Sequence, residues 1–96
     1  MEILKTVNGE ELNVSLDGRL DTITSTEFDA FLSENLQGIG AITIDCEKLS
    51  YISSAGLRVL LATQKKMKGA LKLKNVQEVV MEVFEITGFV DVLTIE

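Results

Sequence analysis

The feature that most constrains the fold is the regular exchange of strand-like and helix-like hydrophobic patterns along the chain. In some segments apolar residues alternate with polar ones, and in others they recur every three or four residues. In chain order these patterns predict two strands, a helix, a strand, a helix, a strand, a helix and a short last strand. Strands joined through helices favour parallel pairing, so we expect an α/β fold with helices packed on a mixed, mostly parallel sheet of about four or five strands.

The strands are predicted from alternation and from turn residues. Leu12, Val14 and Leu16 alternate with polar residues, and Asn8-Gly9 upstream is a favoured hairpin turn. Asp17-Gly18 is predicted to form an ordinary turn after this hairpin. The segments with a strand pattern are residues 2–7, 11–17, 41–46, 71–74 and 93–95. Residues 47–52 are expected to form a loop.

Three helices are predicted from capping residues and from glycines that stop them. The expected start and stop signals are Thr24-x-x-Glu27 with Gly38, Ser54 with Gly69, and Asn75-x-x-Glu78 with Gly88. The spacing of the aromatic residues on these helices places them in the core, and they are Phe28, Phe31 and Phe84.

The composition narrows the possible functions. The 96 residues include no proline and no linker-like segment, so we expect one domain over residues 1–96. The net charge of −6 comes without a basic cluster, which argues against nucleic acid as a partner. No histidine is present to activate a serine or to bind a metal, so we expect neither enzymatic activity nor a metal or cofactor.

Two further features concern location and redox state. No apolar stretch approaches the roughly 20 residues that span a bilayer, and the N-terminus lacks a signal-peptide pattern. We therefore expect a cytoplasmic protein without membrane insertion. The single cysteine, Cys46, follows an apolar run and is expected to be a small buried hydrophobic residue.

The candidate functional segment runs from Leu49 to Leu57. It leads from the carboxyl end of the central strand into the second helix, where unpaired amides and about half a unit of positive charge favour a phosphate on either Ser53 or Ser54. Gly56 costs about 1 kcal/mol relative to alanine in a helix, which suggests a close approach to the backbone. A capping serine and a packing glycine explain the same spacing, so spacing alone does not identify a switch.

A resemblance to a known family rests on four short segments. They are Ser53-Ser54-Ala55-Gly56-Leu57, Ile44-Asp45, Tyr51-Ile52 and Gly18-Arg19-Leu20-Asp21. Together they resemble the STAS domain family, and within it the stand-alone anti-sigma factor antagonists. The match spans nearly the whole chain and includes the hairpin, the helix order and the strand exit at residues 71–76.

The resemblance implies function by partner switching. An unphosphorylated antagonist of this kind binds an anti-sigma factor, itself a serine kinase, and so frees a sigma factor for transcription. Phosphorylation by that kinase breaks the complex, and a metal-dependent serine phosphatase resets it. By position in the motif, Ser54 corresponds to the phosphorylated serine and Asp21 to the acidic residue of the neighbouring loop.

The resemblance also implies which residues contact the partner, with two departures from the family pattern. The expected contact residues are Asp21, Ser53, Ser54, Ala55, Gly56 and Arg58. Ser53 stands where many members carry aspartate, and Ala55 where serine is common. Ser53 places a second hydroxyl beside the first, and we prefer Ser54 because of its fixed offset from Gly56 in the family motif.

Three alternatives to the antagonist are compatible with parts of the sequence. A response-regulator receiver would use Asp45, but the paired acidic residues that bind magnesium are missing after the first strand. A serine hydrolase would need a Gly-x-Ser-x-Gly elbow and a histidine, and both are absent. A STAS interaction subunit of a membrane transport system, including lipid transport, or of a stress-signalling complex remains open.

Overall fold

The strand segments of the sequence join into one five-stranded sheet with the order β1-β2-β3-β4-β5. A computed structural model describes all 96 residues. The strands are β1 (Glu2–Asn8), β2 (Glu11–Leu20), β3 (Ala41–Ile52), β4 (Leu71–Lys74) and β5 (Thr94–Ile95). β1 pairs antiparallel with β2, and every other neighbouring pair is parallel. The predicted α/β fold with a mixed, mostly parallel sheet is therefore confirmed.

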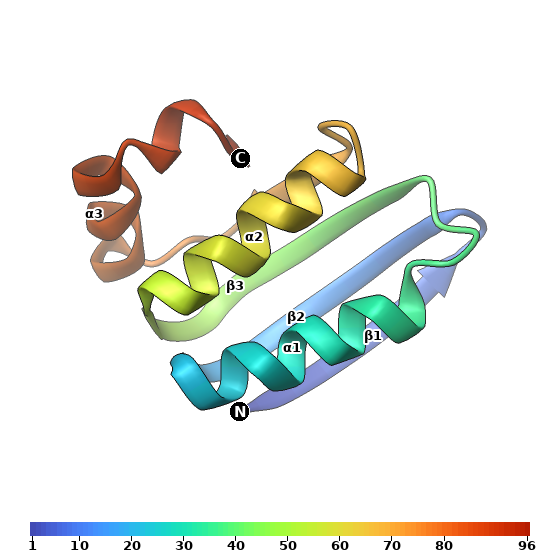
Figure 1. Cartoon of the computed structure of the whole chain (residues 1–96), viewed down its shortest axis with the longest axis horizontal. Coiled ribbons are helices and arrows are strands. Elements are labelled where there is room, and N and C mark those ends of the chain that lie inside the picture. Colours follow the sequence, from blue (N-terminus) through green and yellow to red (C-terminus); the bar gives the residue numbers. More distant parts are fainter.

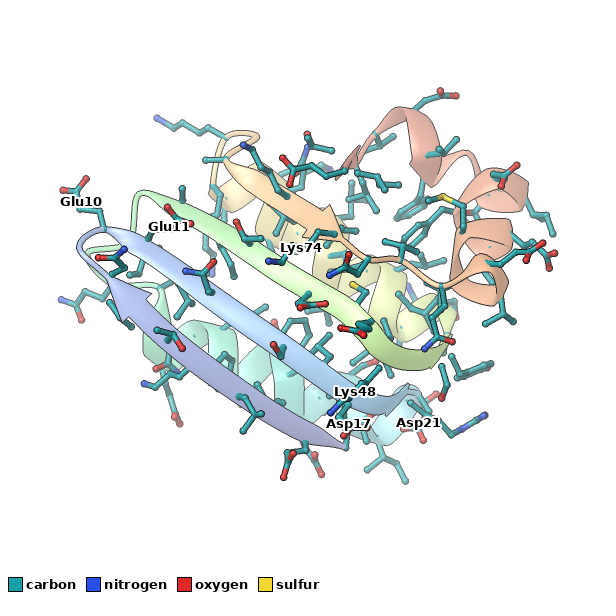
Figure 2. All side chains as sticks on the ribbon, turned by 180° about the vertical axis from the view of Figure 1, so that it is seen from behind. Glu10, Glu11, Asp17, Asp21, Lys48 and Lys74 are labelled. Atoms are coloured by element: carbon teal, nitrogen blue, oxygen red, sulfur yellow. The ribbon has the colours of Figure 1, made fainter.

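The helices connect the parallel strands and lie on one side of the sheet. They are α1 (Thr22–Asn35), α2 (Ser54–Lys66) and α3 (Glu78–Thr87), followed by the short 3-10 helix η1 (Phe89–Asp91). α1 and α2 run side by side over the strands, while α3 lies at the margin of the domain (Figure 1). Seen from behind, the opposite face of the sheet is not covered by any helix (Figure 2).

The core fills the space between the sheet and the helices. Leu12, Val14 and Leu16 point from β2 towards the helices, as their alternation predicts, and all three are buried. Phe28 and Phe84 are fully buried as predicted, whereas Phe31 is only half-buried and packs against the edge of the core.

Cys46 belongs to this core, as predicted. Only 2% of its surface is exposed. Removal of the thiol from water disfavours the thiolate, so burial raises the pKa of Cys46 to about 12. The thiol therefore acts as a packing group and not as a nucleophile.

Two predictions about the strands are wrong. Residues 47–52 continue β3 instead of forming a loop, and Gly18 lies inside β2 instead of in a turn. The pairing of β2 with β3 contains two irregularities, between Ser15 and Asp17 and between Gly18 and Arg19. These bulges break the alternation of buried and exposed residues, which made the extended segment resemble a loop. Gly18, at the second irregularity, has a positive φ of 123°, which glycine adopts without strain.

The predicted caps of two helices are also wrong. α1 begins three residues earlier than predicted, because Asp21 is its N-cap and Thr24 is the third residue of the helix. α3 begins after its N-cap residue Gln77, whose side chain makes no capping hydrogen bond. Asn75 instead adopts a positive φ of 57°, and its side chain donates a hydrogen bond of 3.2 Å to Asp45 Oδ1. The predicted stop at Gly88 is confirmed by its left-handed conformation.

None of the three helices combines the length and the apolar composition needed to cross a membrane.

Candidate functional site

The candidate site is the corner where β2 and β3 end and two helices begin. Leu20 pairs with Ile52 at the ends of these parallel strands, and the Ser53 amide donates a 2.9 Å hydrogen bond to the Leu20 carbonyl oxygen. The next residues, Asp21 and Ser53, are the N-caps of α1 and α2. The N-terminal ends of both helices therefore lie next to one another (Figure 1), and their amides and dipoles favour negative charge here.

The two serines at the start of α2 have different roles. The Ser53 hydroxyl accepts a hydrogen bond of 3.3 Å from the Gly56 amide and so caps the helix. Ser54 is the first helical residue, it is exposed, and its hydroxyl makes no hydrogen bond within the chain. Of the two hydroxyls, the one on Ser54 is free to meet another molecule.

Gly56 is a packing residue. A Cβ added to it would lie 2.8 Å from Ile52 Cγ1 and 2.9 Å from Leu20 Cγ, which are atoms of the core. The close approach that the sequence suggested is therefore made by the ends of β2 and β3. Gly56 is buried, so it shapes the corner by letting the first turn of α2 sit directly on the strands.

Asp21 closes a capping box at the start of α1. Its carboxylate accepts hydrogen bonds from the amides of Ile23 at 3.0 Å and Thr24 at 2.9 Å, while its own amide donates to Thr24 Oγ1 at 2.8 Å. The bond from the Thr24 amide is the main reason why the pKa of Asp21 lies below its ordinary value of 3.8. Asp21 thus stays charged at the N-terminal end of α1.

The lowered pKa of Asp21 predicts a pH-dependent stabilisation. A carboxylate with a lowered pKa stabilises the fold above its ordinary value of 3.8, and this stabilisation is lost as the pH falls through the lowered value. We expect wild type to have a higher melting temperature than Asp21→Asn at neutral pH and the difference to shrink on acidification. Melting curves from neutral pH to about pH 2 test this. Asp29→Asn, at an exposed position of the same helix, is the control, and equal effects of both substitutions would contradict the capping role.

One side-chain pair at this corner was not predicted from the sequence. The Arg19 guanidinium lies 4.1 Å from the centre of the Tyr51 ring, a cation–π contact between the ends of β2 and β3. The two residues are partners in the sheet register, so only the pairing of β2 with β3 reveals the contact. Ile23, 74% exposed in the first turn of α1, adds an apolar side chain nearby.

The charged residues around the corner come from several elements. Figure 2 shows Asp17, Asp21 and Lys48 at the same end of the sheet, away from Glu10 and Glu11 at the hairpin end. Arg58 is exposed one turn after Ser54 on α2. No group of histidine, cysteine, aspartate and glutamate side chains is arranged to hold a metal ion. The corner is a mixed-charge surface with a free hydroxyl and an exposed apolar residue, which suits a protein partner.

Comparison with known proteins identifies the family. The model of the STAS domain family matches residues 2–96. A Bordetella bronchiseptica protein assigned as an anti-sigma factor antagonist, BtrV, is 34% identical over 84 residues, covering 83% of this chain and 72% of the relative. The anti-sigma-B factor antagonist of Bacillus subtilis is 30% identical over 91 residues, covering 92% and 84%.

Solved structures share the fold of this chain. The anti-sigma factor antagonist SpoIIAA in its unphosphorylated form has a TM-score of 0.75 at 19% identity, covering 99% of this chain and 87% of that one. The phosphorylated form of SpoIIAA from Bacillus gives 0.74 at 20% identity, covering 99% and 91%. STAS domains of this type are binding proteins, and the chain is accordingly not an enzyme. The family model and the two sequence relatives show that this chain belongs to the STAS domain family.

Proposed function

We propose that the chain is an anti-sigma factor antagonist whose partner is an anti-sigma factor with serine kinase activity. The unmodified protein binds this kinase through the corner where α1 and α2 begin, and phosphorylation of Ser54 releases it. The observation that carries the proposal is the division of roles between two hydroxyls: Ser53 is occupied as a cap, while Ser54 is exposed and unpaired. A kinase needs a hydroxyl that is exposed and unpaired, as that of Ser54 is.

The relatives support this proposal. BtrV and the Bacillus subtilis protein are both named as anti-sigma factor antagonists. SpoIIAA exists in an unphosphorylated and a phosphorylated form, and this chain resembles the two almost equally, with TM-scores of 0.75 and 0.74. A switch in which the surface charge changes and the fold does not is consistent with this equal similarity.

The electrostatics of the corner support release by phosphorylation. A phosphate on Ser54 adds about −1.5 to −2 charges at neutral pH. The amides at the start of α2 offset part of this charge, so the helix tolerates it. The carboxylate of Asp21 on the neighbouring helix repels the phosphate, and so does any acidic partner group that had faced the free hydroxyl. The phosphate therefore destabilises the interface with the partner and not the fold. A metal-dependent serine phosphatase in the cytoplasm then removes the phosphate and restores the form that binds the partner.

The site of modification is testable without knowing the kinase. We expect incubation with magnesium ATP and an extract of the native cells to add phosphate to wild type and Ser53→Ala but not to Ser54→Ala, as read by peptide mass mapping. Both variants should keep the melting profile of a folded domain. Phosphate on Ser53 would contradict the assignment, and no phosphate on any variant would favour a constitutive STAS subunit of a transport or stress-signalling complex.

A further inference from the structure

A stripe of apolar side chains lies along one flank of α3. It consists of Val79, Val83 and Ile86, spaced four and three residues apart, and we call it the α3 stripe. Val79 is 51% and Ile86 is 86% exposed, whereas Val83 is half-buried. This spacing places all three on one line along the helix, on the flank next to Val80 and Phe84, which anchor α3 in the core. No element covers this margin of the domain (Figure 1).

A row of glutamates runs parallel to the α3 stripe. Each apolar residue of the stripe is preceded by a glutamate, and this glutamate row consists of Glu78, Glu82 and Glu85. All three glutamates are exposed, and none forms a salt bridge within the chain. The helix therefore presents an apolar line with a line of uncompensated negative charge beside it.

The excess negative charge of the chain is concentrated around α3. All nine basic residues lie at or before Lys74, and residues 75–96 contain five acidic residues and no basic one. Since the net charge of the chain is −6, most of the excess negative charge belongs to this last segment. The α3 stripe thus lies in the most acidic part of the molecule.

We propose that the α3 stripe and the glutamate row dock a basic amphipathic helix of a partner protein. Apolar residues of that helix would cover the stripe, and its lysines or arginines would face the glutamates. The charge pattern disfavours a second copy of this chain, because the same acidic segment would then stand on both sides of the interface. It argues equally against an anionic membrane surface. The site uses none of the residues of the Ser54 corner, so the proposal stands independently of the proposed function.

The docking of a basic helix is testable with synthetic peptides. The probe is a peptide of about five helical turns with leucines spaced along one face and lysines elsewhere, and the matched control carries glutamate in place of lysine. Each peptide is titrated into the full-length, isotope-labelled protein while the amide resonances are recorded. We expect the lysine peptide to shift resonances of α3 and η1, with little change in α1, and the glutamate peptide to shift none.

Matched variants separate docking from general attraction to an acidic protein. We expect Val79→Ser combined with Ile86→Ser to weaken the lysine peptide about tenfold or more. Glu82→Lys combined with Glu85→Lys should weaken it similarly and allow the glutamate peptide to bind. The control is Glu27→Lys with Glu34→Lys, the same charge change at exposed positions of α1. All these positions are exposed, so the variants should fold, which melting curves verify.

Three outcomes would overturn the proposal. The first is a set of resonance shifts spread over all acidic surfaces, and the second is equal weakening by the α1 control. The third is a homodimer that dissociates in the Val79→Ser, Ile86→Ser variant, as measured by light scattering, because a second copy would then be the occupant.

Discussion

Replacement of Phe84 by alanine is expected to lower the free energy of unfolding by about 3–5 kcal/mol. Phe84 is fully buried, and it is the largest side chain by which α3 is anchored in the core. Its removal loses the apolar transfer free energy of the ring and leaves a cavity that the surrounding strands cannot fully close. Domains of this size have a total stability of about 5–15 kcal/mol, so the variant should be partly unfolded at ambient temperature or close to it.

Urea unfolding followed by circular dichroism measures this loss, and Ile86→Ala is the matched control. Ile86 belongs to the same helix but is 86% exposed, so its truncation should change the free energy of unfolding by less than about 0.5 kcal/mol. Similar losses for Phe84→Ala and Ile86→Ala would contradict the described orientation of α3 and, with it, the exposure of the α3 stripe.

Replacement of Gly56 by valine is expected to destabilise the protein by about 2–3 kcal/mol. Even the Cβ of the new side chain would lie 2.8 Å from Ile52 Cγ1 and 2.9 Å from Leu20 Cγ. Both neighbours are buried, so they have no open space into which they can move. The first turn of α2 must then lift from the ends of β2 and β3, which displaces the Ser53 cap.

Ala62→Val is the control for the effect of valine on helix propensity. Ala62 is exposed in the same helix, so valine there should cost no more than about 0.7 kcal/mol. The two free energies of unfolding are compared in the same urea experiment. If Gly56→Val lowers the free energy of unfolding no more than Ala62→Val does, tight packing is not the reason for glycine at position 56.

The sequence predicted the order of elements because each has a strong local pattern. The strand β2 is indicated by Leu12, Val14 and Leu16, which alternate with polar residues. The helix α3 ends at Gly88, because glycine readily adopts the left-handed conformation found there. The second half of β3 was missed because its buried residues Leu49 and Ile52 are three positions apart. This spacing arises from bulges in the pairing with β2, and such irregularities depend on two distant segments at once.

The helix starts were predicted less well because more than one residue near each start is suited to the N-cap position. Both Asp21 and Thr24 are good N-cap residues, and the choice of Asp21 follows from the point where β2 ends. The same limit applied to the candidate site. Local sequence indicated a helix start near Ser53 and Ser54, but only the hydrogen bond from the Gly56 amide shows which hydroxyl is the cap. The contact between Arg19 and Tyr51 needed the sheet register as well.

The central claim is that the charge at Ser54 decides whether the partner is bound. The most direct measurement is calorimetric titration of the anti-sigma factor kinase from the same organism with wild type, Ser54→Ala, Ser54→Asp and Ser53→Asp. Ser53→Asp is the matched control, because aspartate is the residue that many family members carry at this contact position, retains an acceptor for the cap and adds the same charge one residue away.

We expect wild type, Ser54→Ala and Ser53→Asp to bind with similar affinity and Ser54→Asp to bind about 100-fold more weakly. Equal binding by all four proteins, or a selective loss with Ser53→Asp, would contradict the assignment of Ser54 as the switch.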